Sequence, residues 1–584
     1  MSVLPPAPPA IRSKRQRFLL IFIAALLVTA VVVAAVVWFK FFRHVPREFD
    51  SPEEYFKYGS IGTEDERGVP YWIWVVLPRV FPEHLPDPGG YTAIGITWED
   101  GREMPVGFTK EKIGFDRVGI NCALCHTATY RETAVSDTVV VPGGPATSFD
   151  PQGYLRFLSL SARDSRFNAD TLLAAIEYEI KLSWLDRQLY RYFIIPATRK
   201  ALLEQADSDR WMTERPAWGH GRIDPFNPVK FDQLAMNSDR DATVGNSDVM
   251  PLWRLDDRRS SRGETHLHWD GLNTDLREVV LSGAIGDGAT HDSLPVERLD
   301  ELTAWLRKHQ PDDLLEYPFQ IDPALAAEGA TIFEKHCAEC HGQGGARTNT
   351  VVALSAIGTD GNRLAMWNPP PDDPPHPAER YNAFADGYDW DLKRFRKTDG
   401  YVATPLTAIW LRAPYLHNGS VPTLWDLLHP SLPPPEAEAL VDTIGDAALG
   451  RNDVADRLHT LLDKAGAPTQ APERVRTELD ALKPLVDQVV ETARSRGYRP
   501  PLFYRGSNIL TTRSFDDDSS SEQQDERRLV GFVHTSDGLD DRRLAVPYAT
   551  FVRGNGNRGH EGSRYGTDLN DQQRRALVEY LKTL

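Results

Sequence analysis

The 584-residue sequence predicts a mainly α-helical protein of two similar domains with long irregular loops, preceded by one N-terminal transmembrane helix. Three observations support this prediction. Residues 18–39 are uncharged and almost entirely apolar, each half of the remaining chain carries one Cys-x-x-Cys-His run, and several segments repeat apolar residues at nearly 3.6-residue spacing. The 43 prolines and 42 glycines indicate that irregular loops join the helices.

The N-terminal segment predicts a membrane anchor. Residues 1–17 form a basic tail, and residues 18–39 are long enough to cross a hydrocarbon core as a helix. The apolar run exceeds the roughly 7–15 residues of a signal-peptide core, and no clear small-residue cleavage site follows it. Basic residues ahead of the run favour a cytoplasmic N-terminus. We therefore expect an uncleaved signal-anchor, with a cleaved signal peptide as the alternative.

Two short runs contain all four cysteines of the chain: Cys122-Ala-Leu-Cys125-His126 and Cys337-Ala-Glu-Cys340-His341. This spacing is the attachment signal for c-type haem, in which the thiols add to the haem vinyl groups and the histidine becomes the proximal iron ligand. A four-cysteine zinc site or two disulfides would rarely need a histidine directly after each pair. The sequence therefore predicts two covalent haem c groups, with His126 and His341 as iron ligands.

Covalent haem c agrees with the predicted anchor, because bacteria attach this haem on the outer side of the cytoplasmic membrane. We expect a single-pass protein whose bulk lies in the periplasm. The net charge of −17 argues against nucleic acid as a partner and weakly favours a basic redox partner or electron donor.

The first haem domain is predicted to span residues 44–310. Within it, residues 44–120 have the composition of an extended, aromatic-rich lead to the first cysteine pair. Apolar residues in near-helical spacing predict a helical stretch around Pro151–Leu203. A further helix is expected over Val296–His309, ending before Pro311.

The second haem domain is predicted to span residues 322–584. Asp322 is expected to cap, and Pro323 to begin, the helix that leads to the second cysteine pair. Residues 434–497 are acidic and poor in glycine, and are interpreted as an inserted helical pair. Asp516–Arg528 is predicted to be a polar surface loop, and the chain is expected to close with a capped amphipathic helix.

Several strings resemble those of the rubber oxygenase-type dihaem c cytochromes, within the bacterial dihaem cytochrome c peroxidase superfamily. They extend from about residue 52 to the C-terminus. They are Phe56-Lys-Tyr-Gly-Ser-Ile-Gly62, Gly119-Ile-Asn-Cys-Ala-Leu-Cys-His126, Leu267-His-Trp-Asp-Gly271, Ala413-Pro-Tyr-Leu-His-Asn-Gly-Ser-Val-Pro-Thr-Leu424 and Gly554-Asn-Gly-Asn-Arg-Gly-His-Glu561.

The resemblance implies two cytochrome c-type domains whose haems differ in function. The N-terminal haem is expected to react with dioxygen or peroxide, and the C-terminal haem to transfer electrons with two strong axial ligands. The membrane anchor and the 434–497 insertion depart from the rubber-cleaving members, and both disfavour polyisoprene as a substrate.

The resemblance also implies further site residues. His560 matches the second ligand of the C-terminal haem, the alternative being an exposed loop histidine. His417 is a rival for that role, or a haem-pocket residue that supports the site or hydrogen-bonds a propionate. Trp253 matches best, and Trp269 second, a tryptophan between the haems, against simple core packing. If His268 lies over the reactive iron, it favours acid–base handling of peroxide.

Arg222 and Asp224 are interpreted as neighbours of a haem propionate or as residues that brace their loop, with a structural salt bridge as the alternative. Three functions remain open from the sequence. They are a redox enzyme of oxygenase or peroxidase type, a pure electron-transfer cytochrome that serves a membrane redox chain, and a haem-based sensor.

Overall fold

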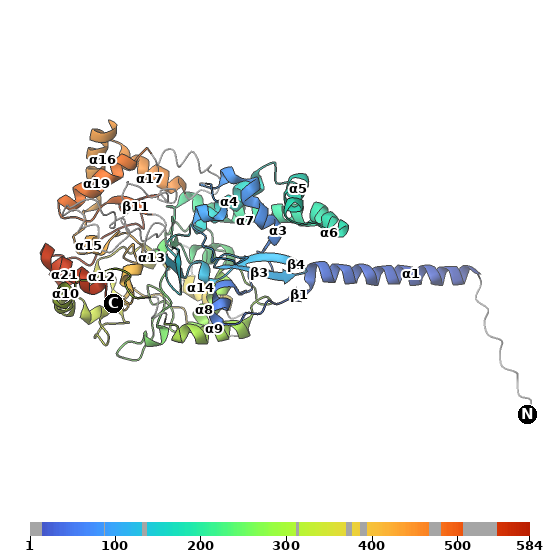
Figure 1. Ribbon diagram of the computed structural model, residues 1–584, viewed down its shortest axis with the longest axis horizontal. Coiled ribbons are helices and arrows are strands. Elements are labelled where there is room, and N and C mark those ends of the chain that lie inside the picture. Colours follow the sequence, from blue (N-terminus) through green and yellow to red (C-terminus); the bar gives the residue numbers. More distant parts are fainter. Residues whose placement is uncertain are drawn as a thin grey trace, which may run out of the picture.

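The computed structural model describes residues 14–86, 88–130, 137–310, 315–368, 377–385, 394–465, 481–505 and 546–584. A mostly helical body lies at one end of a long projecting helix (Figure 1). The predicted mainly α class is confirmed, although short strands are more frequent than the sequence suggested.

The projecting helix α1 spans Lys14–Val37 and continues through a π-helical turn, η1, at Trp38–Phe42. No residue of either element is buried, and the segment is long and apolar enough to cross a membrane. It contains the predicted span, residues 18–39, and is either a single membrane anchor or a signal sequence.

Residues 44–120 form a four-stranded antiparallel sheet rather than the extended lead that the sequence predicted. The strand order is β1-β3-β4-β2, with helices α2 and α3 packed beside it. The bounds are β1 His44–Val45, α2 Pro52–Tyr58, β2 Val69–Pro70, α3 Tyr71–Val80, β3 Phe108–Ile113 and β4 Phe115–Ile120.

The hairpin of β3 and β4 escaped the sequence analysis because charged residues interrupt the apolar alternation of both strands. Lys110 forms an ion pair with Asp116 at 3.5 Å, whereas the register partners Glu111 and Arg117 hydrogen-bond other segments of the chain. Gly114 joins the two strands at φ 73°, in the left-handed region that favours glycine. The sheet delivers Cys122 directly, two residues after β4 ends.

The helical stretch predicted around Pro151–Leu203 is broken into several helices. Loops and a π-helical turn interrupt it, and further helices complete the first half of the chain. The bounds are α4 Pro151–Arg163, α5 Ala169–Glu179, α6 Trp184–Leu189, η5 Tyr190–Ile194, α7 Ile195–Ser208, η6 Asp209–Glu214, η7 Val229–Gln233, α8 Leu276–Gly286 and α9 Val296–Lys308. Two small hairpins accompany them, β5 Thr127–Tyr130 with β6 Val139–Pro142 and β7 Arg222–Ile223 with β8 Ser247–Asp248.

The second half opens as predicted, with Asp322 capping helix α10 (Pro323–His336) and Pro323 in its first turn. Helix α10 packs against the last helix, α21 (Asp571–Leu581), where a Cβ on Gly329 would lie 1.9 Å from the Ala576 carbonyl oxygen. The predicted capped C-terminal helix is confirmed with Asn570 as its cap. Between them lie α11 Ala338–His341, β9 Val351–Ala353, α12 Leu354–Ile357, α13 Asn362–Ala365, α14 Pro377–Ala385, β10 Gly400–Val402, η10 Ile409–Leu411 and α15 Leu424–Leu427.

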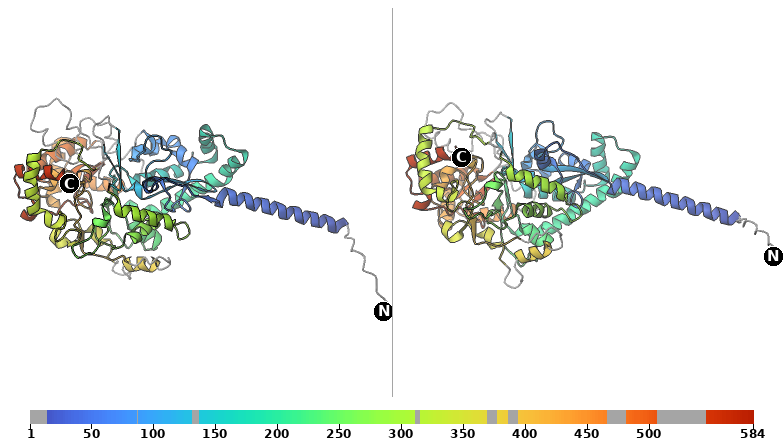
Figure 2. Two further views of the ribbon diagram at one scale, coloured as in Figure 1. Left: turned by 60° about the horizontal axis from the view of Figure 1, so that its bottom comes forward. Right: turned by 90° about the horizontal axis from the view of Figure 1, so that it is seen from below.

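The segment 434–497 is helical as predicted, but it contains three described helices rather than a pair. With the β11–β12 hairpin it forms a hydrophobic core of its own, away from α1 (Figure 2). The bounds are α16 Pro434–Leu449, α17 Val454–Ala465, α19 Lys483–Ser495, β11 Leu502–Arg505 and β12 Val546–Ala549. The predicted loop Asp516–Arg528 lies outside the described residues.

In each of two larger cores, segments from one half of the chain pack with residues of the other half. The core of the second half contains Tyr130 and Val141 from the β5–β6 hairpin, together with Trp253. The core of the first half contains Trp367 and Phe395, which follow the second cysteine pair in the sequence. Each of these two cores therefore includes side chains from both halves of the chain.

Candidate haem sites

The second Cys-x-x-Cys-His run lies at the wall of a large cavity. Cys337 follows the last turn of α10, and Cys340 and His341 lie on the short helix α11. The cavity has a volume of about 540 Å³, within the roughly 300–1,000 Å³ of small-molecule and cofactor sites. Its lining is largely apolar, including Leu406, Ile409, Leu424, Leu428, Leu577 and Leu581.

Two imidazoles face each other across this cavity. The rings of His341 and His560 are nearly parallel, with 27° between their planes and 6.4 Å between their centres. At metal–nitrogen distances of about 2 Å, one metal ion bound by both rings sets their centres about 6 Å apart. His341 donates its Nδ1–H to the Thr404 carbonyl at 2.7 Å, which leaves Nε2 as the ligand atom. The pair fits a haem iron held from both sides.

His560 belongs to a loop that close backbone packing and a buried arginine hold in place. Gly559, at φ 96°, and His560, at φ 55°, both have left-handed backbones, and a Cβ on Gly559 would lie 2.6 Å from the Thr359 nitrogen. The buried Arg499 guanidinium donates to the carbonyls of Asn557 and Gly559. Burial and the charges of His341 and Arg499 lower the pKa of His560 to about 3, so its imidazole is neutral and able to bind a metal.

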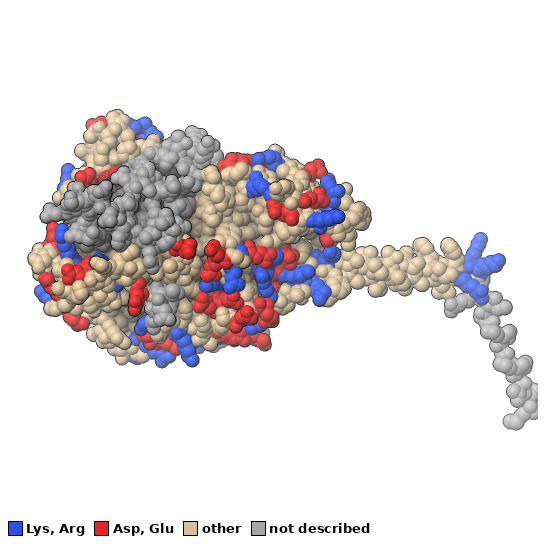
Figure 3. All heavy atoms as spheres, in the orientation of Figure 1, with Lys and Arg blue, Asp and Glu red and all other residues tan. Residues whose placement is uncertain are grey.

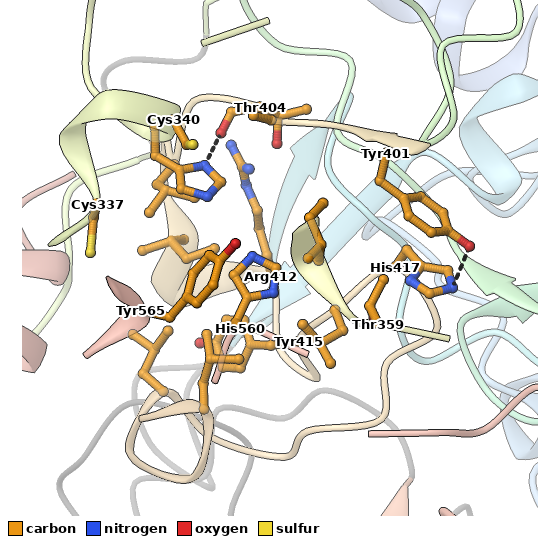
Figure 4. Close-up of a pocket in the computed structure, with 18 of the residues that line it drawn as sticks. Cys337, Cys340, Thr359, Tyr401, Thr404, Arg412, Tyr415, His417, His560 and Tyr565 are labelled. Atoms are coloured by element: carbon orange, nitrogen blue, oxygen red, sulfur yellow. Dashed lines mark hydrogen bonds between the residues drawn. The ribbon is translucent and has the colours of Figure 1, made fainter. Parts of the chain in front are cut away.

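His417 lines the same cavity but points elsewhere. Its ring stacks on Tyr401, with 4.2 Å between centres, and its Nε2–H donates to the Tyr401 hydroxyl oxygen at 3.0 Å, since that hydroxyl gives its own proton to the Asp360 carbonyl. Figure 4 shows His417 beside Tyr401, apart from Cys337 and Cys340, whereas His560 lies between Tyr415 and Tyr565. The geometry favours His560 as the second ligand and His417 as a pocket residue.

The first Cys-x-x-Cys-His run follows the sheet and is enclosed by the β5–β6 hairpin. Asn121 caps the turn of Cys122, and the Gly143 amide donates to the His126 carbonyl at 2.8 Å. His126 donates its Nδ1–H to the Met250 carbonyl at 2.9 Å, as His341 does to Thr404. Burial lowers the pKa of His126 to about 4, so its Nε2 is free to bind a metal.

His268 lies near His126 in an aromatic cage. Phe226 and Phe395 flank its ring, at 5.7 and 5.9 Å between ring centres, and its backbone φ is 64°. Burial, then the charges of Arg363 and His126, lower the pKa of His268 to about 3. Among the described residues no group hydrogen-bonds its buried Nε2. The ring is therefore a neutral imidazole among aromatic rings, with the Arg363 guanidinium nearby.

The two candidate tryptophans both lie where the halves of the chain meet, but they differ in their contacts. Trp253 is 1% exposed and donates to the Pro142 carbonyl next to the first site, while the Arg412 guanidinium lies 5.9 Å from its ring centre. Arg412 lines the second cavity, so Trp253 lies between the two sites. Trp269 lines that cavity directly and donates to the Asp248 carbonyl at 2.6 Å.

Arg222 and Asp224 do not pair with each other in the structure. Arg222 donates to Asn555 Oδ1 at 2.7 Å and to the Tyr548 hydroxyl at 3.2 Å, and Asp224 accepts from Asn227 at 2.6 Å. Both are buried and hydrogen-bond loop residues, which agrees with the interpretation that they brace their loop and not with a salt bridge between them.

The two alternatives for the cysteines find no support. All four thiols are free, and none belongs to a cluster of three or more metal-binding side chains in the described part of the chain. The cavity residues Tyr401, Arg412 and Tyr565 were not found by sequence analysis, because no motif marks them. One cluster of metal-binding side chains does occur among the described residues, formed by Glu83, His84 and Asp164. The Arg166 guanidinium forms ion pairs with Glu83 and Asp164, and the cluster lies outside both sites.

Comparison with known proteins identifies part of the second site. A family model described as RoxA-like, cytochrome c-like matches residues 400–435, the segment that contains Tyr401, Arg412 and His417. The chain is 36% identical over 93 residues to the Cbb3-type cytochrome c oxidase subunit CcoP of Cereibacter sphaeroides, covering 15% of this chain and 31% of that protein. It is also 36% identical over 146 residues to the uncharacterized protein y4iM of Sinorhizobium fredii, covering 20% of this chain and 31% of that protein.

The chain contains a cytochrome c-like domain. It spans about a third of the length of each of these two relatives. Such a domain implies covalent haem c, haem binding and electron transfer, and therefore redox partners.

Proposed function

We propose that this protein is a membrane-anchored, periplasmic dihaem c-type cytochrome that acts as a redox enzyme on dioxygen or peroxide. Bound haem would supply electron transfer at both sites and small-ligand chemistry where an axial position is open. The observation that carries the proposal is the difference between the two histidine environments. His341 has a parallel imidazole partner at 6.4 Å, whereas no ring in the described residues stacks on His126 in this way.

The residues of the second site suit electron storage and transfer. Cys337 and Cys340 would attach the haem, and His341 and His560 would hold its iron from both sides. Arg412 and Tyr565 line the same cavity and would face the bound group. With both imidazoles in place, small ligands are excluded from this iron.

The residues of the first site suit proton handling beside a bound small molecule. Cys122, Cys125 and His126 would hold the haem, and the neutral His268 would stand on the open side. A neutral imidazole among Phe226 and Phe395 can take a proton from peroxide and return it as the O–O bond breaks to give water, while the aromatic rings exclude bulk solvent. The two electrons for this cleavage would come from bound haem and the external electron donor. Trp253 would carry electrons between the sites.

Carbon monoxide binding to the purified protein, after chemical reduction, tests this proposal. We expect one of the two haems to bind carbon monoxide and the other to remain a low-spin, six-coordinate centre. Binding at neither haem would contradict the enzyme and favour the electron carrier. The similarity to a cytochrome c oxidase subunit is the observation that supports the carrier as second candidate.

Peroxide turnover separates the two candidates further. The fully reduced enzyme should consume peroxide repeatedly when an electron donor is supplied, whereas a carrier would be oxidised once and stop.

A further inference from the structure

Large apolar side chains are exposed in two places in the described part of the chain. One is the segment from Phe18 to Val45, which includes α1. The other is the segment 178–193, where Tyr178 is 82% exposed and Trp184 is 77% exposed. The full set in this second place is Tyr178, Trp184, Leu185, Tyr192 and Phe193, which we call the aromatic tip.

The aromatic tip stands on elements that are otherwise well packed. Helix α5 buries Leu172, Leu173 and Ile176 in the core of the first half, and η5 buries Tyr190 and Ile194. Ser183 caps α6 through its hydroxyl. The tip is therefore the outer face of an ordered, amphipathic helical protrusion. Poor packing does not explain why its side chains are exposed.

The protrusion adjoins the base of the projecting helix. Lys40, in the turn that ends α1, donates to the Asp186 carboxylate of α6 at 2.6 Å. Figures 1 and 2 show α5 and α6 on the side of the body from which α1 emerges. Strand β1 pairs with β3 directly after this turn, so the base of α1 is fixed to the body at two points.

The chemistry of the tip matches a bilayer interface. Tryptophan and tyrosine concentrate at the headgroup level, and basic side chains beside them attract anionic lipid. Arg79 lies over Tyr178, 4.8 Å from its ring centre, and forms an ion pair with Glu179, while Arg187 pairs with Glu177 at 3.0 Å. Lys181 is the exposed cation between the aromatics. In the space-filling view the end of this protrusion is mainly uncharged, with Lys and Arg as well as Asp and Glu beside it (Figure 3).

We propose that the aromatic tip is a second membrane contact, lying in the headgroup region of the leaflet from which α1 emerges. A single helix leaves a body free to swing and rotate above the bilayer. With Tyr178, Trp184, Tyr192 and Phe193 also inserted, two separated contacts fix which face of the body meets the lipid. The membrane thereby sets one orientation of both haem sites.

A spin label at Trp184→Cys in the full-length protein tests this contact. The protein is inserted into vesicles of phosphatidylethanolamine and phosphatidylglycerol, and the parent protein treated with the same spin label controls for reaction at its own cysteines. Collisions with oxygen, which enters lipid, are compared with collisions with a water-soluble nickel complex. Ser495→Cys, exposed on α19 in the insertion, is the matched control.

We expect the oxygen-to-nickel ratio at position 184 to be several-fold higher than at position 495. Equal ratios would overturn the proposal. A label at 184 that is immobile yet inaccessible to oxygen would mean that protein covers the tip, and would overturn it too. Vesicle flotation separately reports whether α1 anchors the chain, so failure of the anchor and failure of the tip are distinguishable.

A second label identifies the side chains responsible. At Lys181→Cys, the oxygen-to-nickel ratio should fall to the water-like value of position 495 when Tyr178, Trp184, Tyr192 and Phe193 are all replaced by serine. These four side chains are exposed, so their replacement leaves the core intact. An unchanged ratio would show that the aromatics do not hold the tip in the lipid.

Discussion

The two Cys-x-x-Cys-His regions share a signal of five positions but differ in what surrounds it. The first follows a four-stranded sheet and has His268 nearby among aromatic rings, whereas the second follows helix α10 and faces a parallel imidazole from the far end of the chain. On the proximal side both histidines bond a backbone carbonyl in the same way. The difference teaches that the signal defines only one face of each site, and that remote residues define the other.

Removing the second imidazole should change this comparison most. In His560→Ala, the second site keeps His341 alone, so its low-spin electron paramagnetic resonance signal should disappear while the signal of the first site persists. The reduced variant should bind carbon monoxide at both sites, and the parent at one. His417→Ala is the matched control, and should leave the low-spin signal of the second site in place. Loss of that signal in His417→Ala instead would exchange the two roles.

Replacing His268 should convert the first site into a purely aromatic one. General acid–base groups contribute about 10²–10⁴-fold to a rate, so His268→Phe should lower peroxide turnover by about that factor. The spectrum of the second site should not change. His291→Phe, at an exposed position, is the control and should retain full turnover. Full turnover in His268→Phe would remove the proposed proton-handling role.

The two tryptophans offer a sharper test of how the sites communicate. Trp253→Phe should slow electron transfer between the haems, measured by flash photolysis of the mixed-valence protein, because Trp253 lies between Pro142 and Arg412. Trp269→Phe should instead shift the midpoint potential of the second haem, since Trp269 lines its cavity. If Trp269→Phe slows the transfer more, the path runs along the wall of the cavity.

Replacing a buried acid in each half should give the smallest difference between the two regions, a difference in Tm that depends on pH. Asp209, in the first half, is 4% exposed and accepts one hydrogen bond from Gln205, and burial raises its pKa to about 7. Because this lies above the usual value of about 3.9, stability is greatest at low pH and is lost as pH rises through 7. Asp209→Asn should raise Tm by a few degrees at pH 8 and hardly at all near pH 4.

The control for this contrast comes from the second half. Asp426 accepts two hydrogen bonds from Arg494, at 2.9 and 2.7 Å, so Asp426→Asn breaks an ion pair and should lower Tm at pH 8. The two substitutions are chemically identical, so opposite signs would arise from pairing alone. An increase in Tm for both would show that the Arg494 pair does not stabilise the fold.

Local signals account for what could be predicted from the sequence. Asp322 and Pro323 marked the start of α10, and the apolar run marked α1, because a cap and a continuous period are written in neighbouring residues. The β3–β4 hairpin and the breaks after Pro151 were missed, since charged residues interrupt the apolar alternation of the strands and the breaks depend on tertiary packing. Among the site residues, Arg412 and Tyr401 could not be found, because only the fold brings them to the cavity.

The exchange of segments between the two cores has a consequence for how this protein is made and engineered. A gene divided near residue 315 would yield a first product without Trp367 and Phe395, and a second product without the β5–β6 hairpin and Trp253. Neither product could close its core, so the halves are not interchangeable modules.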